Sequence, residues 1–574
     1  MIKILKNLST YKWIIVGVFG LVFIQSMADL YLPTLMADII DEGVVHGDLP
    51  YIWKIGGFML VVAAFGAIAS VFASYYSSKA AMGLGRDIRR KVFTHVEKFS
   101  LQEFDEVGTA SLITRTTNDI TQIQQVVIMM LRMVVSAPIM FVGGVIMAVS
   151  KDAKLSLVIV GTMPVLVISV LLIMNKGIPL FKTVQKRLDR LNLVLRENLT
   201  GIRVIRAFNR EKQEKERLQT ANRELTDVSI KVNKVMAFMM PVMMLVMNLT
   251  VVAIIWFGGI RIGNQGMEIG DLMAFIQYVM QIMFAIVMAS MMFVMVPRAA
   301  VSANRINEVL SMEPTFLDEG TKAANSEKGT LEFENVTFYY PGAEEPALSH
   351  ISFRSSQGET TAIIGGTGSG KTTLVNLIPR FYEVTEGTIR LNGVDIRESS
   401  QKEIRSKIGF VPQKALLFTG SIAENIRFGK EDATIEEIEH AAKIAQADDF
   451  ISKMEDSYDS EITQGGSNVS GGQKQRLSIA RALVRKPDIY IFDDSFSALD
   501  YKTDASLRAA LKEETKNSTV ILVAQRVSTV IDADRIIVLD KGKLAGKGTH
   551  KELLETNEVY REIVESQLSE EEIA

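Results

Sequence analysis

Six apolar runs in the first half of the chain are too long to be ordinary core helices of a soluble protein. A helix needs about 20 consecutive apolar residues to cross the hydrocarbon core of a bilayer. The runs cover approximately residues 13–35, 55–75, 126–149, 155–174, 235–256 and 272–296. No small-residue cleavage site follows the first run, so it is not a cleavable signal peptide. The sequence therefore predicts a helical membrane domain with six spans over residues 1–315.

Lysine and arginine gather on alternate sides of these spans. They follow the second and fourth spans and precede the first, whereas the loop at residues 41–48 has neither. Since such residues favour the inner side of a membrane, we expect both termini to be cytoplasmic and the chain to lie in the cell membrane. The inner connections, residues 76–125 and 175–234, have amphipathic patterns. They predict long helical extensions of the spans, with a solvated charged stalk as the alternative.

Charge and composition exclude several kinds of site. The formal net charge is only −3, which argues against a nucleic-acid binder. The chain has no cysteine, so disulfides, thiol nucleophiles and thiolate metal sites are excluded. Its five histidines are scattered singly, and a histidine metal cluster is not expected.

A polar linker at residues 316–329 separates the spans from a soluble α/β domain, residues 330–574. A short buried-strand pattern, Thr361–Ile364, runs into a segment that fits G-x-x-x-x-G-K-[ST]. Backbone N–H groups of such a loop wrap phosphates, its lysine reaches the β- and γ-phosphates, and its hydroxyl faces Mg²⁺. The predicted nucleotide-contacting residues here are Gly365, Gly366, Thr367, Gly368, Ser369, Gly370, Lys371, Thr372 and Thr373.

Two further segments complete this chemistry. An apolar strand, Ile489–Phe492, ends in Asp493, and a carboxylate in that position suits the Mg²⁺ side of a nucleotide. Ser470, Gly471, Gly472 and Gln473 open a helix. The free N–H groups and positive dipole end of that helix predict a second anion site.

In their order, these motifs resemble those of the ATP-binding cassette (ABC) transporters, and the resemblance covers essentially the whole chain. It implies that ATP and Mg²⁺ bind the second half. Tyr340 matches the aromatic residue that stacks on adenine, and Gln413 matches the Q-loop glutamine near Mg²⁺ and the attacking water. Ser470–Gln473 matches the signature motif, with Val469 where leucine is usual, and Asp500 matches the end of the D-loop.

The first half carries the same resemblance. Gly108–Asp119 looks like the first intracellular loop of ABC exporters, and Glu197–Phe208 looks like the second. Six spans fused ahead of one cassette is the exporter arrangement and makes half a transporter. The implied fold is a polytopic α-helical membrane domain with long intracellular extensions, of the type IV exporter kind, fused to an α/β P-loop nucleotide-binding domain.

The chain departs from the family pattern at two positions of the hydrolysis machinery. Asp494 stands where the family has its catalytic glutamate, and its shorter side chain leaves its oxygens about 1 Å short, which can cost on the order of 10²-fold in rate. Gln525 stands where the family has its switch histidine and cannot carry a proton. Thr463–Asn468 also lacks the acidic residue that many exporters carry. These departures predict a site that binds Mg-ATP and hydrolyses it slowly; the alternative is tolerated variation in an active site.

An impaired site has a consequence for assembly. In this family each ATP lies between the phosphate loop of one cassette and the signature of another, so a homodimer of this chain would hold two impaired sites. The resemblance therefore implies a non-identical partner half-transporter that supplies the catalytic glutamate and switch histidine. The Ser470–Gln473 segment of this chain would complete the competent site, as in heterodimeric bacterial multidrug exporters.

Residues in the spans suggest what crosses the membrane. Gln277 and Gln281 lie one helical turn apart beside Tyr278, and the fifth and sixth spans are rich in methionine, which adapts to varied ligands. We expect ATP-driven export of amphipathic drugs by alternating access. A lipid or peptide exporter and an ATP-gated channel-like subunit are the alternatives. The methionines also fit plain packing, and Asp29 fits either a gate or an interfacial carboxylate.

Overall fold

The computed structural model describes residues 1–315, 320–322 and 327–567, without the side chains of residues 291, 293 and 294. Most of the predicted linker, residues 316–319 and 323–326, lies outside this set. The chain divides into two compact units. The first unit comprises Met1–Glu97 and Gly108–Met312, and the second comprises Lys98–Val107 and Glu313–Ala574.

The first unit consists of helices, and six helical stretches of its described residues are long and apolar enough to cross a membrane, as predicted. Its elements are α1 (Ile2–Leu5), η1 (Lys6–Tyr11), α2 (Lys12–Asp38), η2 (Ile39–Val44), α3 (Leu49–Val96), α5 (Thr109–Thr116), α6 (Asn118–Lys151), α7 (Leu157–Thr200), α8 (Ile202–Ala207), α9 (Glu211–Ala237), α10 (Met239–Gly263) and α11 (Ile269–Ser311). At 1.5 Å per residue, a helix as long as α3 spans about 70 Å, more than twice a bilayer core. The predicted helical extensions of the spans are therefore present.

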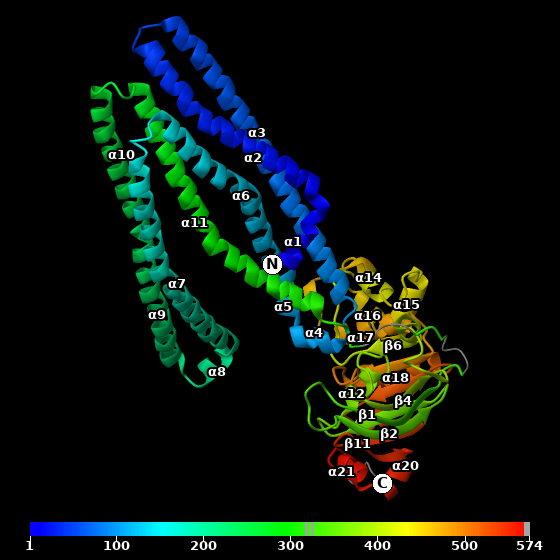
Figure 1. Cartoon of the computed structure of the whole chain (residues 1–574). Coiled ribbons are helices and arrows are strands. Elements are labelled where there is room, and N and C mark those ends of the chain that lie inside the picture. Colours follow the sequence, from blue (N-terminus) through cyan, green and yellow to red (C-terminus); the bar gives the residue numbers. More distant parts are fainter. Residues whose placement is uncertain (316–319, 323–326, 568–574) are drawn as a thin grey trace. The chain divides into compact units, whose positions relative to one another are not determined.

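Within the first unit the helices pack in pairs (Figure 1). α2 lies against α3, α6 against α11, and α7 against α9 and α10. Tyr278 on α11 is fully buried, and its hydroxyl lies 2.6 Å from Oγ1 of Thr34 on α2. Gln281 donates from Nε2 to the backbone oxygen of Asp29 over 2.9 Å, whereas Gln277 is exposed. The two glutamines thus have different surroundings.

A buried carboxylate fastens the ends of two helices on the side of the long extensions. Asp119 on α6 is 1% exposed and accepts hydrogen bonds from Ser302 Oγ at 2.8 Å and Arg305 Nη2 at 2.5 Å, both on α11. One turn away, Arg115 pairs with Glu308 at 2.9 Å. These contacts join α5 and the start of α6 to the end of α11.

The second unit contains two main sheets and a layer of helices. Its strands are β1 (Leu331–Phe338), β2 (Leu348–Ser355), β3 (Thr360–Gly365), β4 (Glu386–Leu391), β5 (Val394–Asp395), β6 (Ile408–Val411), β7 (Gly420–Ser421), β8 (Glu461–Ile462), β9 (Ile489–Asp493), β10 (Thr519–Val523), β11 (Arg535–Asp540) and β12 (Lys543–Gly548). The larger sheet has the order β12-β11-β3-β10-β9-β6 and is parallel except for β12. The strands β2-β1-β4-β5 form an antiparallel sheet. β7 pairs with β8.

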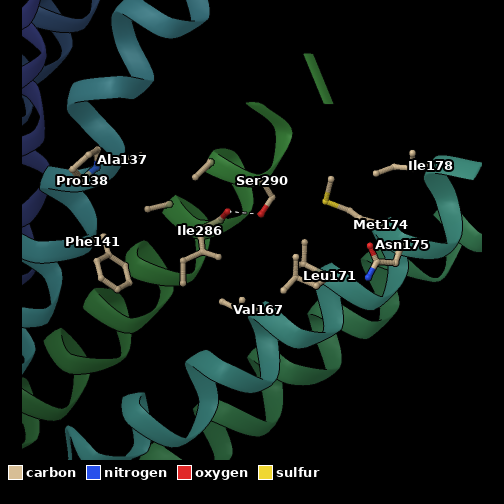
Figure 2. A pocket seen from close by; sticks show the side chains of 13 residues that line it. Ala137, Pro138, Phe141, Val167, Leu171, Met174, Asn175, Ile178, Ile286 and Ser290 are labelled. Carbon is tan, nitrogen blue, oxygen red and sulfur yellow. Dashed lines mark hydrogen bonds between the residues drawn. The ribbon is translucent and has the colours of Figure 1, made fainter. Parts of the chain in front are cut away.

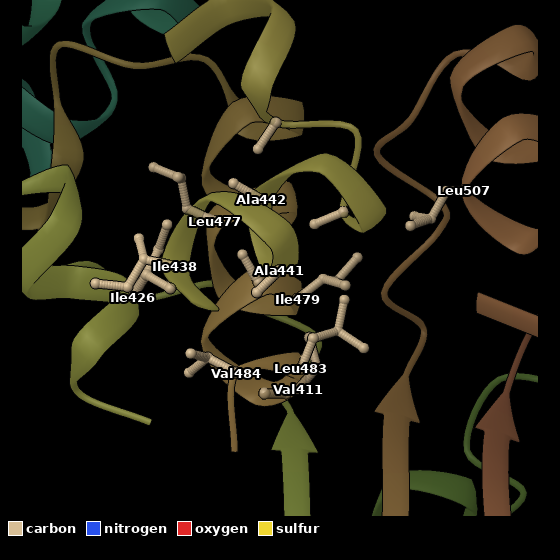
Figure 3. Packing of buried hydrophobic residues seen from close by; sticks show 14 of the residues in the cluster. Val411, Ile426, Ile438, Ala441, Ala442, Leu477, Ile479, Leu483, Val484 and Leu507 are labelled. Carbon is tan, nitrogen blue, oxygen red and sulfur yellow. The ribbon is translucent and has the colours of Figure 1, made fainter. Parts of the chain in front are cut away.

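Helices cover the sheets and complete the core of the second unit. They are α4 (Leu101–Val107), α12 (Lys371–Leu377), α13 (Gln401–Ser406), α14 (Ile422–Arg427), α15 (Ile435–Ile444), α16 (Asp448–Ile451), η3 (Ser457–Asp459), η4 (Gln464–Gly466), α17 (Gly471–Leu483), α18 (Tyr501–Glu514), α19 (Val527–Val530), α20 (His550–Thr556) and α21 (Glu558–Glu565). Figure 3 shows apolar side chains of α14, α15 and α17 in one cluster, in which Val411 at the end of β6 lies beside Leu483 of α17. This packing fixes α17 beside the parallel sheet.

Candidate functional site

The phosphate-loop motif follows β3 directly and opens α12. Gly368 and Gly370 have φ values of +80° and +98°, which are costly for any residue with a Cβ. At Gly366 and Gly368 an added Cβ would meet nothing within 4 Å, so the space beside these two glycines is open. At Gly365, by contrast, an added Cβ would lie only 2.2 Å from the backbone oxygen of Leu539, so there is no room for a side chain. The glycines thus serve both the turn and the close packing behind it.

Lys371 folds back over this loop. Its Nζ donates to the backbone oxygens of Gly365 and Gly366 over 2.9 and 2.8 Å. Burial lowers the pKa of Lys371, with Asp494 and Asp493 acting in the opposite direction. The Oγ atom of Ser369 is buried without a hydrogen-bond partner among the described residues. An ammonium held at the loop and an unsatisfied hydroxyl both fit a phosphate ligand.

Thr372 and Asp493 form the candidate Mg²⁺ position. Thr372 donates from Oγ1 to Oδ1 of Asp493 over 3.2 Å, and Asp493 is 2% exposed at the end of β9. Burial raises the pKa of Asp493 to about 6. The described residues contain no cluster of three or more His, Cys, Asp or Glu side chains that could hold a metal. Mg²⁺ commonly uses one or two protein ligands together with substrate phosphates, so this pair fits.

Gln413, Asp494 and Gln525 meet because their strands are neighbours. Gln413 follows β6, Asp494 follows β9 and Gln525 follows β10, and parallel strands bring their carboxyl ends to one edge. Oδ2 of Asp494 accepts from Nε2 of Gln525 at 2.9 Å and from Nε2 of Gln413 at 3.3 Å. Asp494 has φ +48°, in the left-handed region that aspartate tolerates better than most residues. Burial raises the pKa of its carboxyl.

Tyr340 lies two residues beyond β1 and is partly exposed, with 36% of the residue accessible. Its hydroxyl lies 2.9 Å from Oγ1 of Thr373 on α12, which places the ring beside the phosphate loop. The rings of Phe338 and Tyr382 contact it edge to face, with centroids 5.0 and 5.5 Å away. A partly exposed ring held in this way can stack on a planar base.

The signature segment, Ser470–Gln473, and the D-loop segment, Ser497–Asp500, each supply the N-cap residue of a helix. Ser470 is the N-cap of α17 and forms a capping box with Gln473, and Asp500 is the N-cap of α18, accepting from Thr503 N at 3.0 Å. A Cβ on Gly472 would lie 3.2 Å from the oxygen of Ala498, so the start of α17 lies against the D-loop. Among the described residues, no hydrogen bond joins either segment to Lys371–Thr373.

Tyr382 and the residues of α4 belong to none of the sequence motifs, yet they contact one another near Tyr340. The hydroxyl of Tyr382 donates to Oδ2 of Asp105 over 3.0 Å, and the N–H of Leu101 donates to the oxygen of Phe381 over 3.4 Å. Glu103 on the same helix is 4% exposed and accepts from the N–H groups of Ser100 and Thr315. No local pattern reveals the contacts of Tyr382 with Asp105 and of Thr315 with Glu103, because they join residues more than 200 positions apart.

Two family profiles match the chain, one in each half. The profile of the ABC transporter transmembrane region covers residues 14–287, and that of the ABC transporter domain covers residues 348–497. The chain belongs to the ABC transporter family. This ABC transporter is 41% identical to an uncharacterised ABC transporter ATP-binding protein of Mycobacterium tuberculosis, over 98% of the chain and 97% of that protein.

Two further comparisons concern an exporter and a lipid transporter. An ATP-dependent lipid A-core flippase of Desulfotalea psychrophila is 33% identical over 92% of each chain. The structure of a bacterial Atm1-family ABC exporter with ATP bound superposes with a TM-score of 0.80 at 25% identity, over 98% of this chain and 99% of that one. The chain therefore has the exporter fold, with six spans fused to a nucleotide-binding domain. Its family couples ATP hydrolysis to transport.

The first unit of this ABC transporter contains a cavity of about 680 Å³ between α6, α7 and α11. In Figure 2, Val167, Leu171 and Met174 face Ile286 and Ser290 across it. The lining also includes Ala137, Pro138, Phe141, Val170, Asn175, Ile178, Ala285 and Ala289. None of these thirteen residues is charged, and none of them is a methionine of α10 or of the described side chains of α11.

Proposed function

We propose that the chain is the degenerate-site half of a heterodimeric ABC exporter in the cell membrane, with both termini cytoplasmic. Its phosphate loop, Thr372 and Asp493 hold Mg-ATP, and Tyr340 stacks on the adenine. Hydrolysis at this site is slow. The segment Ser470–Gln473 completes a competent site whose phosphate loop belongs to a non-identical partner.

The hydrogen bond between Gln525 and Asp494 carries this proposal. A catalytic carboxylate has to reach the attacking water and take up its proton as that water attacks. Oδ2 of Asp494 is instead engaged by two neutral amide donors, Gln413 and Gln525. Neither amide can accept or donate a proton as an acid or base. The geometry therefore favours holding the nucleotide over cleaving it.

The residues that bind ATP keep arrangements suited to that task. Lys371 stays at the phosphate loop, and Thr372 remains paired with Asp493. When bound, Mg²⁺ would neutralise charge on the β- and γ-phosphates. The contrast between an intact binding apparatus and an altered hydrolytic one implies that turnover depends on a partner with a glutamate and a histidine at the two positions.

The uncharged cavity supports export of apolar or amphipathic small molecules. Its volume is in the range of drug-sized ligand sites. Ser290 donates from Oγ to the oxygen of Ile286 over 2.8 Å, which leaves Asn175 as the polar lining side chain best able to bond a ligand. A strongly charged substrate would lack a counter-ion among these lining residues.

Purification of the chain with and without its partner tests the proposal. We expect drug-stimulated ATP hydrolysis and dye efflux from vesicles only for the complex, and ATP binding by the chain alone. Changing the partner's catalytic glutamate to glutamine should nearly abolish turnover. Efflux by the chain alone, reconstituted without any partner, would contradict the proposal.

A lipid exporter driven by the same nucleotide-binding domain is the second candidate function. The observation that favours it is the 33% identity to a lipid A-core flippase over almost the full length of both proteins. A fluorescent-lipid flip assay in vesicles separates the two candidates. Lipid movement without dye efflux would support the second.

A further inference from the structure

Tyr340, the residue proposed to stack on adenine, is connected to helix α4 by a short series of contacts. Tyr340 touches Tyr382 edge to face, with the ring planes at 82°, and the hydroxyl of Tyr382 donates to Asp105 on α4. The other edge of Tyr340 is fixed through its hydroxyl at Thr373 on α12. Each member of the series therefore restricts the orientation of the next.

Tyr382 is placed to respond to the orientation of the Tyr340 ring. Burial raises the pKa of Tyr382, and its hydrogen bond to Asp105 acts in the same direction, so the hydroxyl stays protonated and donates at neutral pH. Edge-to-face ring pairs are directional, and a base stacked on Tyr340 would fix the ring orientation that Tyr382 meets. The hydroxyl of Tyr382 would then hold Asp105 more firmly.

Helix α4 is an unusual part of the second unit because of where it lies along the chain. The preceding helix α3 and the following helix α5 both belong to the first unit. Glu103 fastens α4 to Thr315, and Gly108, with φ +75°, ends it. Any change in the order of α4 is thus passed along the chain to α3, a long helix that includes a membrane span, and through the short helix α5 to α6, which includes another.

We propose that Tyr382 is a positioning residue that transmits the presence of adenine on Tyr340 to α4 through its hydrogen bond to Asp105. The proposal rests on the proposed stacking of ATP on Tyr340. Phosphate binding at Lys371 alone does not engage this series of contacts, so the signal depends on the base. Because an aromatic pair couples its members only modestly, the expected effect of ATP on amide exchange in α4 is about two- to tenfold.

Amide hydrogen exchange of the full-length chain in lipid nanodiscs tests the proposal. With Mg-ATP we expect the amides of residues 101–107 to exchange about two- to tenfold more slowly than without nucleotide. Magnesium tripolyphosphate, which has no base, should leave them unchanged at saturation. Equal protection by tripolyphosphate would overturn the proposal.

Conservative variants isolate the hydrogen bond. Tyr382→Phe keeps the ring and should lose the ATP-dependent protection while its Kd for ATP stays within about twofold of wild type. Asp105→Asn retains an acceptor oxygen and should keep the protection, and Asp105→Ala should lose it. Tyr339→Phe and Glu106→Gln, at exposed neighbouring positions, are the matched controls.

The outcomes separate this inference from the proposed function. Protection that persists in Tyr382→Phe, with ATP still bound, would overturn the inference alone. A wild-type chain that fails to bind ATP would overturn the nucleotide site itself. A Kd for ATP that rises steeply in Tyr340→Ala, with protection lost, supports both.

Discussion

Gln525 donates a hydrogen bond of 2.9 Å from Nε2 to Oδ2 of Asp494, where a catalytic carboxylate would face water. The two residues end adjacent strands, β10 and β9, so the contact follows from the order of the sheet. Gln413 donates to the same oxygen over 3.3 Å. An oxygen that already accepts two amide hydrogen bonds is less available to the attacking water, and this arrangement explains why the site is proposed to hold ATP.

Restoring the two family residues should restore hydrolysis. In Asp494→Glu/Gln525→His, the longer carboxylate recovers about 1 Å of reach and the imidazole can carry a proton, so we expect ATP turnover at this site to rise by on the order of 10²-fold. The measurement is single-turnover ATP cleavage by a complex whose competent site is disabled through the partner's glutamate. Asp494→Asn in the otherwise unchanged complex is the control and should alter turnover by less than about twofold. A double variant no faster than wild type would count against the role given to these positions.

Asp493 should make stability depend on pH in the absence of nucleotide. Burial raises the pKa of its carboxyl from 3.8 to about 6, so the folded chain binds more protons than the unfolded chain between these values. Stability therefore falls as the pH rises through this window, by at most about 3 kcal/mol. Asp493→Asn removes the buried charge, and we expect its Tm without Mg-ATP to exceed that of wild type at pH 7.5.

The advantage of Asp493→Asn should shrink at pH 5, where the wild-type carboxyl is largely protonated. Thermal unfolding of the full chain at the two pH values measures this difference. Saturating Mg-ATP should stabilise the wild type more than the variant, because the metal then balances the charge. An advantage of equal size at both pH values would refute the assignment of the effect to ionisation.

Glu103 should be required for the stability of the second unit. Burial by itself would raise the pKa of its carboxyl, but hydrogen bonds from Thr315 and Ser100 outweigh burial and lower it. Its contribution is therefore present above the ordinary pKa of 4.5 and is lost as the pH falls through the lowered value. We expect Glu103→Gln to lose about 1–3 kcal/mol at pH 7.5, because buried N–H donors lose a charged acceptor.

Thermal unfolding at pH 7.5 compares Glu103→Gln with Glu106→Gln. Glu106 is exposed on the same helix, so its substitution should change stability by less than about 0.5 kcal/mol. Equal Tm values for the two variants would show that the buried contacts of Glu103 add nothing.

Filling the cavity should block transport without touching the nucleotide site. Ala289→Trp places an indole among the lining residues of α11, and we expect dye efflux by the complex to fall by about tenfold or more. Basal ATP hydrolysis should stay near wild type. Phe284→Trp on the exposed face of α11 is the matched control. Unchanged efflux in Ala289→Trp would exclude this cavity from the substrate path.

Local patterns in the sequence were enough to predict the spans and two strands of the parallel sheet. Apolar length predicts six spans, and the buried-strand patterns at residues 361–364 and 489–492 correspond to β3 and β9. What the sequence could not provide are contacts between distant residues. The bond from Tyr382 to Asp105 joins positions 277 apart, and α4 clusters with the second unit although it lies between two spans. The hydrogen bonds to the Asp494 carboxylate could not be predicted either, because they depend on how the side chains of Gln413 and Gln525 are oriented.

The rate of ATP hydrolysis by the purified chain alone, compared with that of the chain combined with its partner, tests the central claim most directly. The account predicts that the chain alone binds ATP and turns it over at about 1% of the rate of the complex or less. Turnover by the chain alone at a rate close to that of the complex would contradict it, since the Asp494 and Gln525 site would then be fully competent.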